Sequence, residues 1–368
     1  MKFNKITVNT STKKYKIFLG SDIINKIHKI LNSQKIYFEK CLIIVDKNIP
    51  KKFKNKLFKK IKAKKKIIYN FNATEKNKNY ENVKKLHNLL FINKFNRNDC
   101  IISFGGGITG DIGGFTASIF KRGLKFINIP STLLSQVDSS IGGKTGINNK
   151  FGKNLIGSFH QPDLVISDMK VLSSLPYREI ICGYAEILKS SLIKSSKSFS
   201  FLDKNIYKIL KLKSPYIEKA IIDSCNLKKQ IVEKDEREKN LRKVLNIGHT
   251  FAHAFESTMN FSKKLNHGEA VLLGIRNAIK FSKKIKLLSN EKFLLINNHI
   301  NKLKLKHSYN KLFKKKDLNK IIEFMKSDKK NNSNNINLIL IRDFGKIKIN
   351  FQIKTKRLRR FLLSELNE

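Results

Sequence analysis

The feature that most constrains the fold is an apolar segment that runs directly into a glycine-rich loop. Asp99–Phe104 has the pattern of a buried strand, and Gly105-Gly-Gly-Ile-Thr-Gly-Asp111 follows it without a spacer. The loop satisfies G-x-G-x-x-G, a spacing that lets backbone amides approach a pyrophosphate at a helix N-terminus, and we expect that helix over Asp111–Phe120. The usual acidic residue about 20 positions later is missing, since the next one is Asp138. The segment predicts a non-standard phosphate loop; a plain glycine-rich turn is the alternative.

Strand and helix signals alternate on both sides of this loop. The stretch 80–91 places an apolar stripe on one face of a helix. Strands separated by helices predict a Rossmann-like α/β domain with a mostly parallel sheet, whose ligands bind beyond the carboxyl ends of the strands. Further short apolar runs with the pattern of buried strands are Lys40–Asp46, Lys66–Phe71, Phe126–Pro130 and Asp163–Asp168.

The pattern changes after Pro176, where long helical stretches replace the strands. We therefore expect two domains, an α/β nucleotide-binding domain over 1–176 and an all-helical domain that binds metal and substrate over 177–368. Two late segments, 336–341 and 346–351, fit either a small hairpin or stray strands. The expected helices are Glu179–Ile193, Pro215–Lys234, Val244–Met259 and Glu269–Leu288.

Length and composition narrow the class of protein. A chain of 368 residues fits two domains with a substantial core. It contains no run of about 18 apolar residues, and its first residues lack the apolar stretch of a signal peptide, so we expect a cytoplasmic protein without membrane contact. The four cysteines form no Cys-x-x-Cys pair, which favours free thiols in a reducing compartment. They are Cys41, Cys100, Cys182 and Cys225.

The formal net charge of +48 has two interpretations. One is nucleic-acid binding through counterion release, and the other is compositional drift in an AT-rich genome. Residues 101–160 hold six Lys or Arg, whereas the sixteen residues 51–66 hold ten. A nucleic-acid protein is expected to concentrate its charge on a reading element with aromatic side chains for stacking. We adopt drift and expect no specific nucleic-acid partner, although the charge can steer anionic substrates inward.

Three polar residues in the second half have the chemistry of a metal site. Glu186, His249 and His267 supply one carboxylate and two imidazoles, which leaves one position of a zinc ion open for substrate or water. Lys189 follows Glu186 at i+3, and His253 follows His249 at i+4, so each shares a helix face with its partner. The second histidine is either a further ligand or an acid/base group, and two core histidines are the alternative. Arg242 and Asn246 lie on that same face if the helix extends back far enough.

A second polar region lies at residues 131–154, near the end of the predicted first domain. The stretch 131–146 is dense in glycine and hydroxyl residues and carries Lys144, and Lys153 and Asn154 follow it. Lysines held among glycines and hydroxyls are typical of groups that contact phosphate, whereas the lysines elsewhere have the surroundings of a solvated surface. A solvated loop is the alternative for this stretch.

Taken together, these motifs resemble the 3-dehydroquinate synthase family over about residues 41–330. The triple-glycine loop that ends in Asp111 is shared, and so is each of the motifs that follow in order. They are Leu133-Leu-Ser-Gln-Val-Asp-Ser-Ser140, Gly142-Gly-Lys-Thr145, Gly152-Lys-Asn-Leu-Ile-Gly157, Asp235-Glu-Arg-Glu238, Asn246-Ile-Gly-His-Thr250 and His267-Gly-Glu-Ala270. The resemblance implies a homodimer that uses NAD and a divalent metal, zinc or cobalt.

Carried over by position, the resemblance also implies roles for single residues. The metal ligands are Glu186, His249 and His267. The groups that hold NAD are Asp46, Asn48, Glu75, Lys78, Gly106, Gly107, Ile108, Asp111, Ser131, Thr132, Leu134, Asp138, Ser139, Lys144, Lys153 and Ser174. The substrate and catalytic groups are Lys144, Lys153, Asn154, Lys189, Lys228, Arg242, Asn246 and His253, one of Lys329 or Lys330, and Arg122 from the partner subunit.

The implied reaction converts a sugar acid phosphate, 3-deoxy-D-arabino-heptulosonate 7-phosphate, to 3-dehydroquinate and phosphate. It proceeds by transient oxidation with NAD, phosphate elimination, re-reduction, ring opening and aldol closure, as one step of the shikimate pathway to chorismate and the aromatic amino acids. Another sugar phosphate cyclase and a glycerol-type metal-dependent alcohol dehydrogenase share much of the pattern. A basic nucleic-acid-binding protein that has lost catalysis is a third alternative, against which the intact metal ligands count.

Overall fold

The computed structural model describes residues 3–327 and 335–367. By spatial compactness the chain divides into two units, one formed by 1–180 with 212–237 and the other by 181–211 with 238–368. The change at 180 lies four residues beyond the boundary predicted at Pro176, and residues 212–237 return to the first unit. No helix in the described ranges is both long and apolar enough to cross a bilayer.

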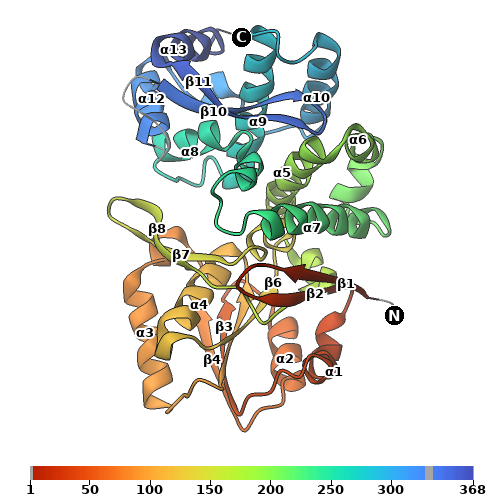
Figure 1. Ribbon diagram of the computed structural model, residues 1–368, viewed down its shortest axis with the longest axis vertical. Helices are drawn as coiled ribbons and strands as arrows, with labels where there is room; N and C mark the ends of the chain where they lie inside the picture. The colour runs from red at the N-terminus through yellow and green to blue at the C-terminus, as the bar shows by residue number, and fades with distance from the viewer. Residues whose placement is uncertain (1–2, 328–334, 368) are drawn as a thin grey trace. The chain divides into compact units, whose positions relative to one another are not determined.

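A seven-stranded sheet forms the centre of the first unit, in the order β1-β2-β9-β6-β5-β3-β4 (Figure 1). All pairings are parallel except that of β1 with β2, which confirms the predicted α/β class. The strands are β1 (Asn4–Asn9), β2 (Lys14–Gly20), β3 (Lys40–Asp46), β4 (Lys65–Phe71), β5 (Cys100–Gly105), β6 (Lys125–Pro130) and β9 (Leu164–Asp168).

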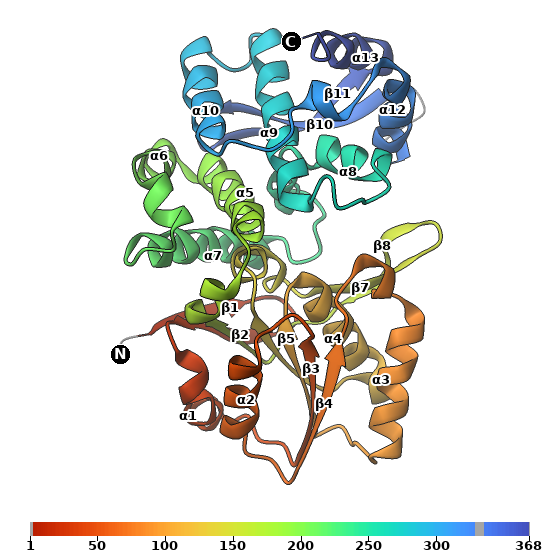
Figure 2. The same ribbon diagram turned by 180° about the vertical axis from the view of Figure 1, so that it is seen from behind.

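The central strands are apolar on both faces because helices cover both faces. On β3, Cys41, Ile43 and Val45 pack on the side of α1 and α2, whereas Leu42 and Ile44 pack on the side of α3 and α4. The views from the two sides show these two helical layers (Figures 1 and 2). The elements of this unit outside the large sheet are α1 (Ile27–Ser33), α2 (Lys51–Lys60), α3 (Tyr80–Ile92), α4 (Gly107–Ile119), α7 (Tyr216–Lys234), the hairpin β7 (Lys144–Asn149) and β8 (Gly152–Phe159), and short turns at Ile23–Lys26, Glu75–Asn77, Phe120–Arg122, Ser135–Ser139 and Met169–Ser174.

The strand order fixes where a ligand fits this sheet. From β3 the chain moves outward to the edge strand β4, then returns to place β5 on the other side of β3. The crossover direction therefore reverses between β3 and β5, and ligands of open α/β sheets bind at such a reversal, beyond the carboxyl ends of the strands. Asp46 ends β3 and Gly105 ends β5. The glycine-rich loop thus lies at the reversal point.

The second unit is mainly helical, as predicted. It also contains one antiparallel hairpin, β10 (Asn335–Asp343) with β11 (Lys346–Lys354), at the two late segments for which a hairpin or stray strands were expected. The unit is therefore not all-helical. Its helices are α5 (Tyr177–Lys194, which begins in the first unit), α6 (Ser196–Leu210), α8 (His249–Thr258), α9 (His267–Lys284), α10 (Asn290–Lys302), α11 (Tyr309–Leu312), α12 (Leu318–Ser327) and α13 (Thr355–Ser364), with short turns at Leu241–Asn246 and Lys315–Asp317.

Candidate metal centre and nucleotide site

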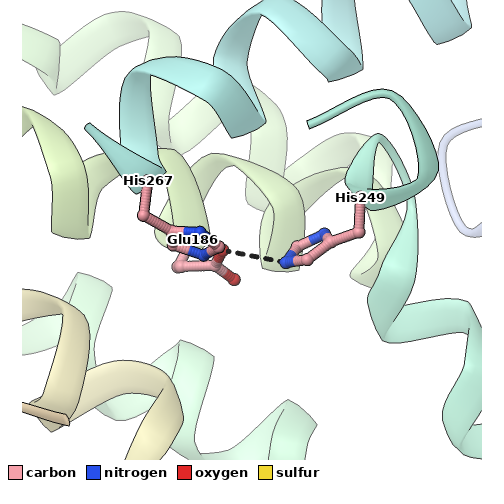
Figure 3. A group of neighbouring side chains, drawn as sticks. All are labelled: Glu186, His249 and His267. Atoms are coloured by element: carbon pink, nitrogen blue, oxygen red, sulfur yellow. Dashed lines mark ion pairs between the residues drawn. The ribbon is translucent and has the colours of Figure 1, made fainter. Parts of the chain in front are cut away.

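Three helices of the second unit bring the three predicted metal ligands together (Figure 3). Glu186 comes from α5, His249 from the first turn of α8 and His267 from the first turn of α9. Glu186 Oε1 lies 3.6 Å from His249 Nε2 and 3.9 Å from His267 Nε2. One donor atom from each residue lies within 4.8 Å of the others.

This geometry fits a tetrahedral ion. Zinc bonds of about 2.0–2.1 Å put neighbouring donors of a tetrahedron about 3.4 Å apart, close to the separations found here. Glu186 is 1% exposed, and neither of its carboxylate oxygens accepts a hydrogen bond from the described residues, although Oε2 forms an ion pair with Lys189. A buried carboxylate left in this state is costly unless a cation completes it. The residues therefore fit a divalent metal.

Both histidines present Nε2 toward Glu186 because an oxygen atom faces the other ring nitrogen. His249 Nδ1 lies 3.3 Å from the carbonyl of Ile247, and His267 Nδ1 lies 3.1 Å from Glu256 Oε2. Burial, with the positive neighbour Lys189, holds the pKa of His249 well below its ordinary value. His249 is therefore neutral, which is the form that binds metals.

Local sequence fixes where these histidines lie. Gly248 has φ of 78°, and a Cβ there would lie 2.7 Å from the backbone nitrogen of Ile275, so glycine lets α8 begin tightly against α9. At the start of α9, the Asn266 side chain caps the helix while the Glu269 side chain bonds back to the backbone of Asn266. The cap sets the first turn of α9, and with it His267.

His253 lies beside the triad, as its i+4 spacing from His249 predicts. Its ring centroid is 5.4 Å from that of His249 and 6.4 Å from that of His267. The helix expected over Val244–Met259 begins only at His249, so the condition under which Arg242 and Asn246 would share its face is not met. Both lie in the separate turn Leu241–Asn246, and the positive φ of Gly248 interrupts the backbone. Asn246 is instead held by Glu238, with Nδ2 donating to Oε1 at 2.6 Å.

In the first unit, the glycine loop leads directly into the N-terminus of α4, where its motif predicts a phosphate cradle. α4 begins at Gly107, four residues earlier than expected, and Gly106 caps it without a side-chain hydrogen bond, so its first amides point outward. A Cβ at Gly107 would lie 3.0 Å from Ser139 Oγ, and one at Gly106 would lie 3.2 Å from Thr132. Bare backbone therefore borders these hydroxyls, as an approaching pyrophosphate requires.

Charged side chains form a network beside this cradle. Lys78 pairs with Asp111 and donates to Asn154 Oδ1 at 2.5 Å, while Lys153 lies 3.1 Å from Glu75 Oε1. Burial opposes ionisation of Glu75, but Lys153 and a hydrogen bond from Asn148 outweigh it and hold its pKa below the ordinary value. Burial raises the pKa of Asp111 and of Asp46.

The stretch 131–154, for which a solvated loop was the alternative, contains a helical turn and most of a β-hairpin. Ser135–Ser139 is a single π-helical turn, a form frequent at functional sites, and Lys228 Nζ donates to Asp138 Oδ1 at 2.8 Å. Lys144 begins β7 and is exposed, and Lys153 lies on β8. The remaining predicted residues of the cradle are Ser131 and Thr132 after β6, Leu134 before the π turn, Ile108 in α4, Asn48 after β3, and Ser174, whose hydroxyl bonds Val171.

Arg122, Lys329 and Lys330 complete the predicted set. Arg122 ends the turn after α4 with φ of 66°, and its predicted place in a partner's site stays a prediction. Lys329 and Lys330 lie outside the described residues.

Burial separates a few basic residues from the rest of this highly basic chain. The chain has 76 Lys and Arg, and in the described ranges the buried ones are Lys78, Lys189, Lys228 and Arg242, at 2–7% exposure. All four belong to the set predicted from the sequence. Each of the three lysines has a carboxylate partner, in Asp111, Glu186 and Asp138.

The sequence did not identify Glu256, the carboxylate that faces His267. It lies three residues after His253, so the spacing i, i+4, i+7 from His249 carried the signal. The fold and the site together define a class: two-unit proteins that combine a mostly parallel α/β sheet with a candidate three-ligand metal site on a mainly helical unit.

Comparisons with known proteins narrow that class. The 3-dehydroquinate synthase N-terminal family matches residues 68–182, and the 3-dehydroquinate synthase C-terminal family matches residues 183–331. A 3-dehydroquinate synthase of Pelagibacter ubique (strain HTCC1062) is 54% identical over 364 residues, which cover 99% of each chain. This chain therefore belongs to the 3-dehydroquinate synthase family, whose members are carbon–oxygen lyases.

Solved structures confirm the fold. A 2-deoxy-scyllo-inosose synthase complexed with carbaglucose-6-phosphate, NAD+ and Co2+ has a TM-score of 0.87 at 22% identity, covering 98% of this chain and 99% of that one. A 2-epi-5-epi-valiolone synthase from Streptomyces hygroscopicus subsp. jinggangensis 5008 with NAD+ and Zn2+ has a TM-score of 0.83 at 21% identity, covering 96% and 97%.

Proposed function

We propose that this chain converts 3-deoxy-D-arabino-heptulosonate 7-phosphate to 3-dehydroquinate and phosphate, with NAD and a divalent metal, zinc or cobalt. The observation that supports this most is the triad of Glu186, His249 and His267, whose donor atoms converge within 4.8 Å of one another. When bound, the metal supplies Lewis acidity to a substrate alcohol and NAD supplies a hydride acceptor. The side chains of the protein then have to bind the substrate, orient it and transfer its protons.

Nucleotide binding is assigned to the cradle of the first unit. The free amides at the start of α4 suit the pyrophosphate, because a helix N-terminus favours anions. Asp46 at the end of β3 and the Glu75–Lys153 pair lie at or beside the carboxyl ends of β3 and β4, where a ribose or nicotinamide needs polar partners.

The basic residues of the predicted set hold the substrate's two anionic groups. Lys144, Lys153, Lys228, Lys189 and Arg242 are assigned to the phosphate and the carboxylate, as the family resemblance implies. The carboxylates that pair with Lys189 and Lys228 keep these buried cations in place, so their charge is oriented before substrate binds. Such preorganisation is how fixed charges stabilise a transition state.

Proton transfer is assigned to His253. It is exposed, yet its ring lies beside both ligand histidines, so it can exchange protons with solvent while facing the reacting centre.

One cuvette experiment tests the reaction. Phosphate release from the heptulosonate phosphate and absorbance of NADH are followed together, with and without NAD and a chelator. We expect phosphate release that needs NAD only in catalytic amounts, without net NADH, because the hydride returns to the substrate. One NADH per substrate without phosphate would instead show an alcohol dehydrogenase.

We also propose a homodimer in which Arg122 completes the partner's site. Arg122→Ala and Lys189→Met chains are each expected to be inactive, but their equimolar mixture should regain about a quarter of wild-type activity, since half of the randomly formed dimers restore one site. If subunits are shown to exchange and the mixture is still as inactive as either variant alone, Arg122 acts in the site of its own chain.

A further inference from the structure

The two ligand histidines are supported by oxygen atoms of different charge. His249 faces a neutral backbone carbonyl, that of Ile247, at 3.3 Å. His267 faces a carboxylate, Glu256 Oε2, at 3.1 Å, and Glu256 is itself buried at 6% exposure. A hydrogen bond from Nδ1 fixes the neutral ring with its lone pair on Nε2, the atom nearest Glu186. Both contacts therefore orient a histidine for metal binding, but only the contact with Glu256 adds a negative charge.

The position of Glu256 follows from the register of α8. His249, His253 and Glu256 stand at i, i+4 and i+7, which places them on one helix face over two turns. α8 packs directly on α9, and a Cβ at Gly274 would lie 2.1 Å from the carbonyl oxygen of Gly248. This close packing of backbones holds Glu256 of α8 beside His267 of α9. One helix therefore both supplies a ligand and faces the ligand of its neighbour.

The balance of charge at the site indicates a second role for Glu256. Glu186 carries the one negative charge among the three ligands, and Lys189 already pairs with it. A divalent cation placed there adds two positive charges to a buried site, where uncompensated charge is costly. Glu256 lies one imidazole ring away and supplies a further negative charge without occupying a coordination position.

We propose that Glu256 is a positioning residue for the metal centre, which orients His267 through Nδ1 and compensates the charge of the ion. This inference rests on the proposed function, since it presumes a divalent metal at Glu186, His249 and His267. Glu256 does not touch substrate or cofactor in this role; it acts through His267.

The first test measures metal affinity of the whole protein by competition with a chromogenic chelator, using zinc or cobalt as the probe. Glu256→Gln keeps the shape and an acceptor oxygen but removes the charge, and Glu256→Ala removes both. We expect affinity to fall roughly 10- to 100-fold, more for Ala than for Gln, as is usual for such outer partners. Affinity equal to wild type in both variants would overturn the proposal.

Glu269→Gln is the matched control. Glu269 is buried to 7% exposure and lies on α9 two residues after His267, where its Oε2 accepts from the Asn266 backbone at 3.0 Å. It supports the helix cap rather than the imidazole. Glutamine keeps an acceptor oxygen for the Asn266 backbone, so the cap that positions His267 persists, and we expect this variant to bind metal as the wild type does. An equal loss of affinity in Glu269→Gln and Glu256→Gln would mean that loosening of α9 alone accounts for the effect.

A second measurement needs no metal. Nitrogen-15 chemical shifts of labelled histidines in the metal-free wild-type protein report the tautomer of each ring. We expect His267 to carry its proton on Nδ1 in the wild type and to become a tautomeric mixture in Glu256→Ala, with His249 unchanged. A mixture at His267 already present in the wild type would overturn the proposal, even if the substituted chains fail to fold.

The two experiments separate this inference from the function on which it rests. A wild-type protein that binds no metal at the triad would refute the proposed metal centre, and the tautomer of His267 would still decide whether Glu256 orients it. A wild-type protein that binds metal, with Glu256 variants that bind it equally well, would leave the proposed function intact and refute the role of Glu256 alone.

Discussion

The lysines of α2 and the lysines of the site differ in their surroundings rather than in their chemistry. α2 carries six lysines in ten residues, and Lys51, Lys52, Lys59 and Lys60 are exposed. Lys78, Lys189 and Lys228 are buried, and each contacts a carboxylate. A buried cation is tolerated only where a fixed partner compensates it, so its position is specified, whereas an exposed lysine is free to move. In a chain of charge +48, burial with a carboxylate partner distinguishes these three lysines of the predicted site from the exposed lysines of α2.

The largest expected effect comes from replacing one of the three predicted metal ligands, one of which, Glu186, is the partner of Lys189. His249→Ala should lower bound metal from about one ion per chain to near zero and reduce phosphate release to background, because two ligands hold zinc poorly. Metal analysis after dialysis and the phosphate assay provide the measurement. A variant that keeps its metal and its activity would remove His249 from the site.

Lys144 is the case that can break the comparison, because it is exposed like the α2 lysines yet belongs to the predicted site. We expect Lys144→Ala to reduce kcat/KM about 10²- to 10³-fold with an unchanged melting temperature, the usual cost of a lost charged donor of about 3–4 kcal/mol. Steady-state kinetics measure it. An effect no larger than that of an α2 lysine would show that burial, and not the glycine-rich motif, identifies the functional lysines.

Glu236 extends the comparison from buried lysines to a buried acidic residue. Burial disfavours its charge, but hydrogen bonds from Ser11, Thr12 and Gln161 outweigh this and lower its pKa to about 2. A carboxylate with a depressed pKa stabilises the fold above its unfolded value near 4.5, and that contribution is lost as pH falls toward 2. Neutral hydroxyl and amide donors therefore stabilise the charge of this carboxylate.

We expect Glu236→Gln to lower the unfolding free energy at pH 7 by about 2–3 kcal/mol and to flatten its decline between pH 5 and about pH 2. Urea denaturation at several pH values measures both. A variant that loses stability equally at pH 7 and at pH 2.5 would show that the shape of the contact matters, and its charge does not.

The smallest effect is expected in α2. Replacement of Lys51, Lys52, Lys59 and Lys60 by glutamine should change kcat/KM less than about twofold at physiological salt, because exposed charges are screened beyond about 8 Å. A larger loss that disappears at high salt would show that the surface charge steers the anionic substrate.

The sequence predicted the parallel sheet and the metal triad well, for reasons that lie in particular residues. The run Lys40–Asp46 is apolar at every central position, which only a strand buried on both faces requires. Glu186, His249 and His267 were identifiable because their side chains are unusual among helix residues and carry the chemistry themselves.

Other features could not be predicted in the same way. The hairpin of β7 and β8 has glycine, lysine and asparagine where strand residues are usual, and in the first unit its strands pair only with each other, so its order depends on tertiary contacts. The break before His249 combines an extended ψ of 129° at Ile247 with the positive φ of Gly248, within a stretch whose sequence has a helical pattern. The spacing of Glu256 places it on the same helix face as His249 and His253, but its contact with His267 depends on how α9 packs against α8.

The return of α7 to the first unit has a consequence for dissecting this protein. The chain passes between the units three times, at 180/181, 211/212 and 237/238. A fragment that starts at residue 181 would contain the whole metal triad, but it would also carry α7 without β1 and the Ser135–Ser139 turn that it packs on. Ile217, Ile221 and Val232, all buried in the full chain, would then be uncovered.

Such a fragment is expected to aggregate for reasons unrelated to the metal centre. A fragment in which a short flexible linker joins residue 211 to residue 238 would omit α7 and leave the second unit's own segments together. Each compact unit is therefore built from two separate segments of the chain, and no single cut in the sequence can separate one unit from the other.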